Sequence, residues 1–382
     1  MNSMRFICCL LILILSLSMI AIGAPATSGV EVNAKAAVLI EASTGQVLYE
    51  LNPNEHLSIA SVTKVMTMLL IMEALDGGRI HLDDMVVCSD YAASMGGSQI
   101  YLEPGEQMSV HDMIKSIAVA SANDACVAMA EHIMGSETAF IEEMNKRAME
   151  LGMKNTNFVN TNGLDEPNHY SSAYDVALVS KELLKHPKIT EYLTIWMDSV
   201  RNGEFGLANT NRLVRFYNGA NGIKTGSTSE ALYCLSAGAK RDGMQLIAVV
   251  LGAPTTNDRF NSASKLLDYG FANYAIMNEA NDGKPLSMVK VHKGTEEELG
   301  VVPNGQLQVL LPKGKQSMVK KNMILPQTIL APVKQGQKVG QIEYILDNKS
   351  LGTVDLIAQK NVNRINPFML FWKLLDQWVS LE

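Results

Sequence analysis

The spacing of apolar residues changes along the chain, and each change predicts a different kind of structure. Two apolar runs around the turn-type residues 43–45 predict a β-hairpin over 36–51. From Ser61 the apolar positions recur at helical spacing until Gly77 and Gly78 end the pattern. Further helices are predicted at 110–120, from Asp124 onward, at 138–151 and at 172–184.

Strands return in the next part of the chain. Apolar runs at 232–238 and 244–251 are joined by residues 240–243, where Asp-Gly is a turn signal. A helix is predicted over 259–271. The order of strands, a helical middle, then strands and a helix predicts an α+β fold, an antiparallel sheet that carries a helical cluster.

A change of composition at residues 280–285 indicates a linker. Beyond it, short strands alternate with Gly, Pro and Asn, which predicts a small all-β domain over 285–360. The larger domain before the linker is predicted to span 24–280.

The final segment, 361–382, is predicted to form an amphipathic helix. Between residues 365 and 381 two tryptophans share the apolar face, which suits a membrane interface. The alternative is a helix docked on the protein itself or on a partner. Lys373 is balanced by Asp376 in the narrow polar stripe, so we expect only weak attraction to anionic lipid.

The N-terminus has the pattern of a signal peptide over 1–23. Arg5 precedes an apolar run that ends in small residues, so the mature chain is expected to begin at Ala24. An uncleaved anchor is the alternative, but the run is short for a membrane span. We therefore expect a protein that is secreted across the cytoplasmic membrane and acts outside it.

Composition excludes several classes of function. The 382 residues are 47% hydrophobic and 19% charged, which is typical of a folded protein. A net charge of -7 argues against a general nucleic-acid binder. Cys88, Cys126 and Cys234, which follow the signal peptide, have neither disulfide-framework nor zinc-ligand spacing, and no HExxH pair occurs. We expect no metal and no cofactor.

Three short motifs carry candidate chemistry. Ser61 and Lys64 would lie one turn apart on a helix face, where a lysine of lowered pKa could take the serine proton. Ser121 and Asn123 fall between two predicted helices, where they could relay a proton and orient Lys64. Each pair alone is weak evidence, because a capping serine with a solvated lysine, or Ser-x-Asn before a helix, is common.

The third motif is Lys224-Thr225-Gly226, just before the strand predicted from Leu232. Lysine and threonine at a strand edge could hold a terminal carboxylate, and the glycine lets a substrate backbone approach and add to the sheet. The alternative is an edge lysine that prevents aggregation.

Together the motifs are far more specific, because S-x-x-K, S-D-N and K-T-G occur as a set in class A β-lactamases and penicillin-binding proteins. Here Ala122 replaces the Asp of the second motif. The chain resembles the low-molecular-weight penicillin-binding proteins of the serine D-alanyl-D-alanine carboxypeptidase family. The resemblance also covers residues 163–164, 169–175, 222–228 and 240–244, and it is closest to the sporulation-associated branch of endospore-forming bacteria.

This resemblance implies a transpeptidase-like catalytic domain whose substrates are peptidoglycan stem peptides ending in D-Ala-D-Ala, with β-lactams as covalent inhibitors. It implies Ser61 as nucleophile, Lys64 as base, and the Ser121 and Asn123 side chains in the proton and substrate network. It further implies that the terminal carboxylate is bound by the Lys224-Thr225-Gly226 strand, and that the backbone N–H groups of Ser61 and Ser227 form the oxyanion hole.

Two other residues have both a functional and a structural interpretation. His169 could contact substrate or the deacylating water, but we favour a structural role in the loop 163–174. Arg259 could support the site beside the strand hairpin, and a surface ion pair is an equal alternative. Three other functions stay open: a β-lactamase, a D,D-endopeptidase on the same scaffold, and a non-catalytic cell-wall scaffold.

Overall fold

The computed structural model describes residues 29–279, 283–305, 307–369 and 371–372. The predicted signal peptide lies outside the described residues, as does half of the predicted C-terminal helix. The described residues from Glu31 onward belong to one compact unit.

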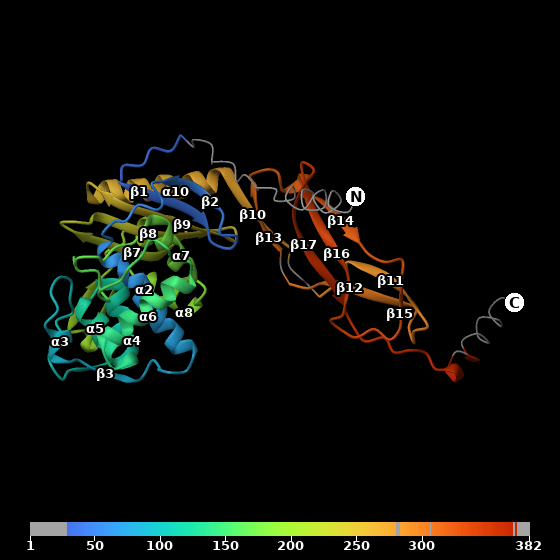
Figure 1. Ribbon diagram of the computed structural model, residues 1–382, viewed down its shortest axis with the longest axis horizontal. Helices are drawn as coiled ribbons and strands as arrows, with labels where there is room; N and C mark the ends of the chain where they lie inside the picture. Colours follow the sequence, from blue (N-terminus) through green and yellow to red (C-terminus); the bar gives the residue numbers. More distant parts are fainter. Residues whose placement is uncertain (1–28, 280–282, 306, 370, 373–382) are drawn as a thin grey trace, which may run out of the picture. The chain divides into compact units, whose positions relative to one another are not determined.

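A five-stranded antiparallel sheet organises the larger domain (Figure 1). Its strand order is β2-β1-β9-β8-β7. The strands are β1 (Ala36–Glu41), β2 (Val47–Leu51), β7 (Ala220–Thr228), β8 (Leu232–Arg241) and β9 (Met244–Ala253). Both predicted hairpins are confirmed, and the β8–β9 turn has positive φ at Asp242 and Gly243, as a type I′ turn requires. β1 and β9 join the two hairpins into one sheet.

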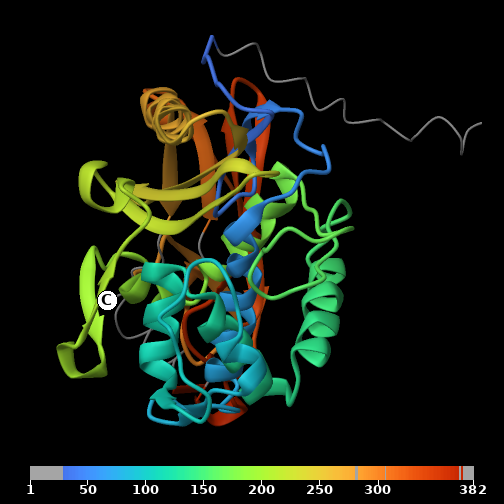
Figure 2. The same cartoon turned by 90° about the vertical axis from the view of Figure 1, so that its left-hand side faces the viewer.

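Helices cover both faces of this sheet. The helical cluster lies on one face and α10 (Thr256–Asn273) on the other (Figures 1 and 2). The cluster contains η1 (Ala60–Thr63), α2 (Lys64–Asp76), α4 (Val110–Ala120), α5 (Asn123–Met134), α6 (Glu137–Glu150) and α7 (Ala173–Leu183). Ten of the 13 residues of α2 are buried, so it is the central helix of the cluster. The α+β prediction is confirmed.

The structure corrects the position of the third motif. Lys224 does not lie in a loop ahead of the strand that begins at Leu232; it lies inside β7, an edge strand of its own that pairs with that strand. The pattern was missed because Asn221, Gly222 and Gly226 interrupt the apolar alternation that marks a strand.

Several short elements were not predicted from the sequence, because a segment of a few residues is too short to show a helical or strand periodicity. They are β3 (Met85–Val87), α3 (Asp90–Ala93), β4 (Gln107–Ser109), α8 (Pro187–Leu193), β5 (Met197–Val200), η2 (Arg201–Gly203), β6 (Phe205–Ala208) and α9 (Leu213–Phe216).

The C-terminal part is all-β, as predicted. Its six-stranded sheet has the order β14-β16-β17-β12-β11-β15, and β10 pairs separately with β13. The bounds are β10 (Tyr274–Glu279), β11 (Ser287–His292), β12 (Glu298–Pro303), β13 (Leu307–Pro312), β14 (Lys320–Ile324), β15 (Thr328–Leu330), β16 (Lys338–Leu346) and β17 (Lys349–Ala358), with η3 (Gln316–Met318). Strand β10 follows α10 directly, so the chain is already extended before the predicted linker.

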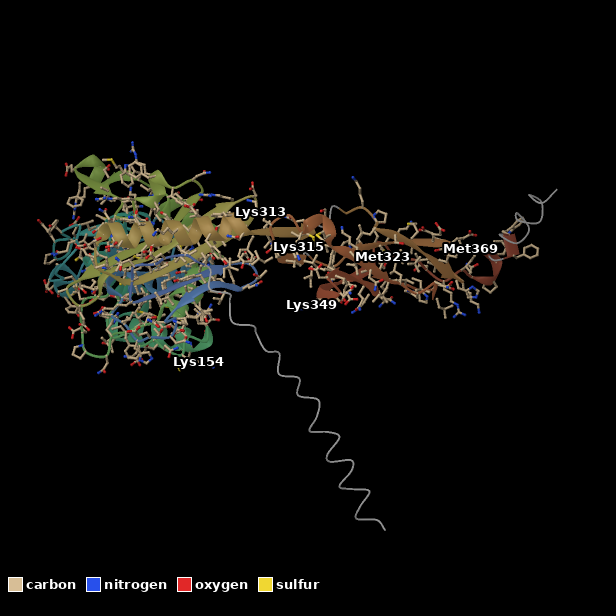
Figure 3. The ribbon with its side chains drawn as sticks, turned by 90° about the horizontal axis from the view of Figure 1, so that it is seen from above. Lys154, Lys313, Lys315, Met323, Lys349 and Met369 are labelled. Carbon is tan, nitrogen blue, oxygen red and sulfur yellow. The ribbon has the colours of Figure 1, made fainter. Side chains whose placement is uncertain are left out.

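Only the beginning of the predicted C-terminal helix is described. Asn366 Oδ1 accepts a hydrogen bond from Met369 N at 2.7 Å, which caps a helical turn. Phe368, Met369, Phe371 and Trp372 are 50–71% exposed, and Met369 is labelled in Figure 3. Within the described ranges, no helix combines the length and apolar character needed to cross a bilayer.

Candidate active site

Ser61 and Lys64 meet at the start of the central helix. Ser61 lies in η1, which runs directly into α2 at Lys64, and Lys64 Nζ is 2.9 Å from Ser61 Oγ. Lys64 is fully buried, whereas Ser61 is partly exposed. Ala60 has φ 48°, a left-handed conformation that is strained for alanine, so the surrounding structure holds the backbone at Ser61 in place.

Lys64 has two further partners. Its Nζ donates to Asn123 Oδ1 and to the carbonyl oxygen of Asn162, both at 2.6 Å. Burial lowers the pKa of Lys64 to about 8, although Cys126 and Asp124 oppose the shift. The amine is therefore neutral far more often near pH 7 than an exposed lysine would be.

Asn123 is held in one orientation. Its backbone N–H donates to Ser98 O at 2.7 Å, and its Nδ2 donates to Gly96 O at 2.7 Å, which leaves Oδ1 for Lys64. Ser121 lies at the α4–α5 junction with φ 64° and is 4% exposed. Asn123 of the predicted second motif thus contacts Lys64, and Ser121 lies two residues before Asn123.

The third motif brings a second lysine to the site from β7. Lys224 is 1% exposed, and its Nζ donates to Thr225 O at 3.0 Å. Burial lowers the pKa of Lys224 well below its usual value, and the positive charge of the nearby Lys64 contributes to the same shift. The alternative of an exposed edge lysine that prevents aggregation is therefore wrong.

Gly226 allows β7 to approach η1. A Cβ on Gly226 would lie 2.8 Å from Ser61 N and 2.8 Å from Ile59 O, closer than real Cβ contacts. Thr225 Oγ1 is hydrogen-bonded to Thr210 Oγ1 at 2.6 Å, and Ser227 is exposed. The backbone N–H of Ser61 and the strand that carries Ser227 are thus neighbours.

The Asn162 carbonyl comes from a tightly turned loop that was not predicted as part of the site. Gly163 N donates to Asn160 Oδ1 at 2.7 Å, and Leu164 N donates to Asn162 Oδ1 at 3.0 Å. A backbone carbonyl has no residue-specific signature, so only the stretch around Gly163 that resembles the family could have indicated it.

His169 ties this loop to η1. Its Nε2 is 2.7 Å from Thr63 Oγ1, and Val159 N donates to its Nδ1 at 3.1 Å. Because Nδ1 accepts, the ring is neutral and its proton lies on Nε2. Burial lowers the pKa of His169 to about 4. Both contacts hold the loop against η1.

Arg259 supports β7 from α10. The side chain is 7% exposed, and Nη1 donates to Gly226 O at 3.1 Å and to Cys234 O at 3.2 Å. Its guanidinium also lies over the Phe260 ring, 4.7 Å from the centroid. Arg259 is therefore buried beside the site strand and does not occupy the surface position that a surface ion pair would need.

The chemistry of the site is that of serine and lysine. Within the described part of the chain, no group of three or more His, Cys, Asp or Glu side chains could hold a metal ion. Burial raises the pKa of Cys88 to about 11, of Cys126 to about 12 and of Cys234 to about 11, so these thiols are not activated nucleophiles.

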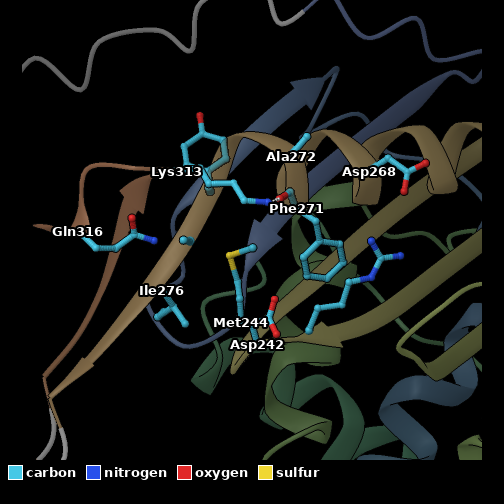
Figure 4. A pocket seen from close by; sticks show the side chains of 11 residues that line it. Asp242, Met244, Asp268, Phe271, Ala272, Ile276, Lys313 and Gln316 are labelled. Carbon is cyan, nitrogen blue, oxygen red and sulfur yellow. Dashed lines mark hydrogen bonds between the residues drawn. The ribbon is translucent and has the colours of Figure 1, made fainter.

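A separate hollow of about 670 Å³ lies between the β8–β9 turn, the end of α10 and the β10–β13 pair (Figure 4). Phe271, Met244 and Lys313 line it, and Lys313 Nζ donates to Phe271 O at 2.9 Å. Arg241, which also lines it, stacks over the Phe271 ring at 4.4 Å. Lys313 and Arg241 thus link the end of β13 and the β8–β9 turn to the end of α10.

A serine backed by a buried lysine, an amide from an interhelix turn and a Lys-Thr-Gly edge strand define the site of a penicillin-binding, serine-type acyl hydrolase. The chain belongs to the D-alanyl-D-alanine carboxypeptidase family, whose model matches residues 23–255. The model of the C-terminal domain of penicillin-binding protein 5 matches residues 278–364.

Curated relatives and solved structures agree with this assignment. The chain is 45% identical over 360 residues to the D-alanyl-D-alanine carboxypeptidase DacF of Bacillus subtilis, covering 93% of this chain and 92% of the relative. It is 36% identical over 359 residues to DacC of Escherichia coli, covering 91% and 90%. The crystal structure of penicillin-binding protein 5 from Haemophilus influenzae superimposes with a TM-score of 0.74 at 35% identity, covering 87% of this chain and 98% of that one. The protein is thus a serine-type D-alanyl-D-alanine carboxypeptidase.

Proposed function

We propose that this enzyme removes the terminal D-alanine from peptidoglycan stem peptides through an acyl-enzyme on Ser61. The observation that carries the proposal is the position of Lys64 Nζ, 2.9 Å from Ser61 Oγ in a buried setting that lowers the lysine pKa to about 8. A buried amine of this pKa can accept the serine proton near neutral pH.

In the neutral form, the Lys64 amine has two N–H bonds and one lone pair. Asn123 Oδ1 and Asn162 O accept the two N–H bonds, so the lone pair is directed to the third neighbour, Ser61 Oγ. Ser61 Oγ bonds to the carbonyl carbon of the penultimate D-alanine, and its proton moves to Lys64. The C–N bond then breaks, and a proton returns through the Ser121 hydroxyl to the departing amine; water later hydrolyses the ester.

The oxyanion that forms on the substrate carbonyl would be bound by the backbone N–H groups of Ser61 and Ser227. One such donor contributes roughly 2.7–4 kcal/mol at the transition state. The substrate backbone would add to the edge of β7, with its terminal carboxylate on Lys224 and Thr225. The close approach of β7 to η1 at Gly226 supports this arrangement.

The protein would act outside the cytoplasmic membrane after loss of residues 1–23 and be held at the membrane surface by the segment 361–382. The apolar pattern of that segment and the exposure of Phe368 and Trp372 support the attachment. On this proposal residues 24–280 form the catalytic domain and residues 285–360 form the β domain. Membership of the sporulation-associated branch of the family stays a prediction.

Mass spectrometry after incubation with benzylpenicillin tests the proposal, with Ser61→Ala alongside. A stable adduct on the Ser61 peptide, absent from the variant, is expected. Rapid penicillin hydrolysis without lasting acylation would favour the β-lactamase, whereas no adduct and no hydrolysis would favour the scaffold. Release of D-alanine from a pentapeptide, compared with cleavage of a cross-linked dimer, separates the carboxypeptidase from the endopeptidase.

A further inference from the structure

Glu137, the first residue of α6, is a buried carboxylate that contacts the loop of Asn162 and the short helix α3. Its Oε1 accepts from Thr161 N at 3.1 Å and from Thr161 Oγ1 at 2.7 Å. Its Oε2 accepts from the hydroxyl of Tyr91, in α3, at 2.9 Å. Only 9% of the residue is exposed. This hydrogen bond and burial raise the pKa of Tyr91 to about 12, so the phenol remains a donor to the carboxylate.

Thr161 immediately precedes Asn162, whose carbonyl accepts from Lys64 Nζ at 2.6 Å. The carbonyl oxygen of Thr161 accepts from Thr67 Oγ1, one turn along α2 from Lys64, at 2.5 Å. The Thr161–Asn162 stretch is therefore held on one side by the central helix and on the other by Glu137. Both contacts are inside the protein, where a hydrogen bond is costly to lose.

We propose that Glu137 is a positioning residue for Lys64: by holding Thr161, it fixes the Asn162 carbonyl that directs the lone pair of the lysine at Ser61 Oγ. The inference rests on the proposed roles of Ser61 and Lys64. Without Glu137 the carbonyl is free to turn, one N–H of the neutral amine loses its acceptor, and the lone pair is no longer confined to the direction of Ser61.

The position of the carbonyl also affects the titration of Lys64. A carbonyl acceptor stabilises the ammonium more than the amine, so losing it lowers the lysine pKa. The other titratable groups that face Lys64 stay in place; they are Asp124 and Cys126 from α5, Lys224 from β7 and His169 from the loop. A change at Glu137 should therefore move the acid limb of the pH profile to lower pH.

The test is the rate of acylation by benzylpenicillin as a function of pH, with a thermal melt of each variant. Glu137→Ala should lower the plateau rate roughly 10- to 100-fold, the scale of a misplaced reacting group, and shift the acid limb below that of wild type. Glu137→Gln should restore most of the rate, because its amide oxygen can still accept from Thr161. Glu142→Ala, at an exposed position of the same helix, should match wild type.

Wild-type plateau and acid limb in a folded Glu137→Ala protein would overturn the proposal. If that variant does not fold, Glu137→Asp provides the answer, because it keeps the charge while withdrawing the carboxylate by one methylene: a reduced plateau at an unchanged melting temperature supports positioning, and an unchanged plateau refutes it. An absence of any Ser61 adduct in wild type would instead refute the proposed function, so the two failures are distinguishable.

Discussion

Gly163 lies so close to Ala60 that a Cβ on the glycine would be 1.9 Å from the alanine carbonyl oxygen. The loop that carries the Asn162 carbonyl is thus packed against the residue before Ser61. Gly163 also has φ 87°, which favours glycine.

Gly163→Ala should therefore displace both the loop and the Ser61 backbone. We expect a loss of about 3 kcal/mol or more in the free energy of unfolding, since overpacking costs roughly 1–3 kcal/mol and a left-handed alanine roughly 1–2. Acylation by benzylpenicillin should fall at least about tenfold. Gly152 has φ 77° with open space around it, so Gly152→Ala measures the backbone cost alone. Equal effects of the two substitutions would contradict this account.

The acylation rate should depend on pH through Lys64. Because burial lowers its pKa to about 8 and only the neutral amine accepts a proton, the rate should rise with pH up to about 8 and then level off. His169 has a pKa of about 4, so its titration should not change the acylation rate near pH 7. Stopped-flow acylation across pH 5–10 checks this. Lys64→Arg should be inactive throughout, since arginine stays protonated; residual acylation near the wild-type rate would remove Lys64 from its role.

His169 should make the protein less stable in acid. Its pKa is about 4 in the folded chain and about 6.5 when unfolded, so the unfolded state binds more protons between these values and stability rises with pH. The stability contributed by the neutral ring is complete above pH 6.5 and is lost as pH falls toward 4, by about 3 kcal/mol in all. Urea unfolding at pH 7 and pH 5 should show about 2 kcal/mol of this loss for wild type and a smaller difference for His169→Gln. The same slope in both proteins would contradict the assignment.

Arg259 should matter for both stability and acylation. Arg259→Lys keeps the positive charge but cannot reproduce both hydrogen bonds to Gly226 O and Cys234 O, so β7 should be held less firmly. We expect a loss of about 1–3 kcal/mol in unfolding free energy and slower acylation by benzylpenicillin. Lys265→Gln, on the exposed side of the same helix, is the matched control and should behave as wild type. Unchanged acylation in Arg259→Lys would restrict its role to the fold.

Deleting residues 365–382 should release the mature protein from membranes while turnover of a soluble peptide stays intact. The reason is that this segment carries the exposed Phe368 and Trp372, whereas the Ser61 site is built from residues of the larger domain. Fractionation of membranes, with a parallel assay of D-alanine release, checks both parts. Continued membrane association would point to an uncleaved signal segment or to a partner.

Much of the fold could be predicted from the sequence, because apolar residues recur at helical spacing along the main helices. The helix at 110–120 was predicted with the bounds that α4 has, and the hairpins were marked by turn residues. Strand β7 was not predicted as a strand, because small and polar residues occupy many of its positions. It is the strand that the substrate would join. The site needed a glycine and a buried lysine there, which conflicts with the apolar alternation of an ordinary strand.

In the candidate site, too, some residues could be predicted from the sequence and others could not. Ser61, Lys64 and Asn123 were indicated by their spacing, because their side chains carry the chemistry. Asn162 acts through its main chain and Glu137 acts through Thr161, so neither has a pattern that a single sequence displays. Contacts between residues far apart in the chain become visible only when the fold brings them together.

The pairing of β1 with β9 sets the order in which the protein can assemble. Ala36 lies opposite Leu251, so two neighbouring interior strands of the sheet come from the beginning and the end of the larger domain. Such a high contact order slows folding, because a long loop must close before the pairing is gained. The β1–β2 hairpin can join the rest of the sheet only once β9 is present, so on the proposed export with the N-terminus first the sheet would stay incomplete until residue 253 has followed.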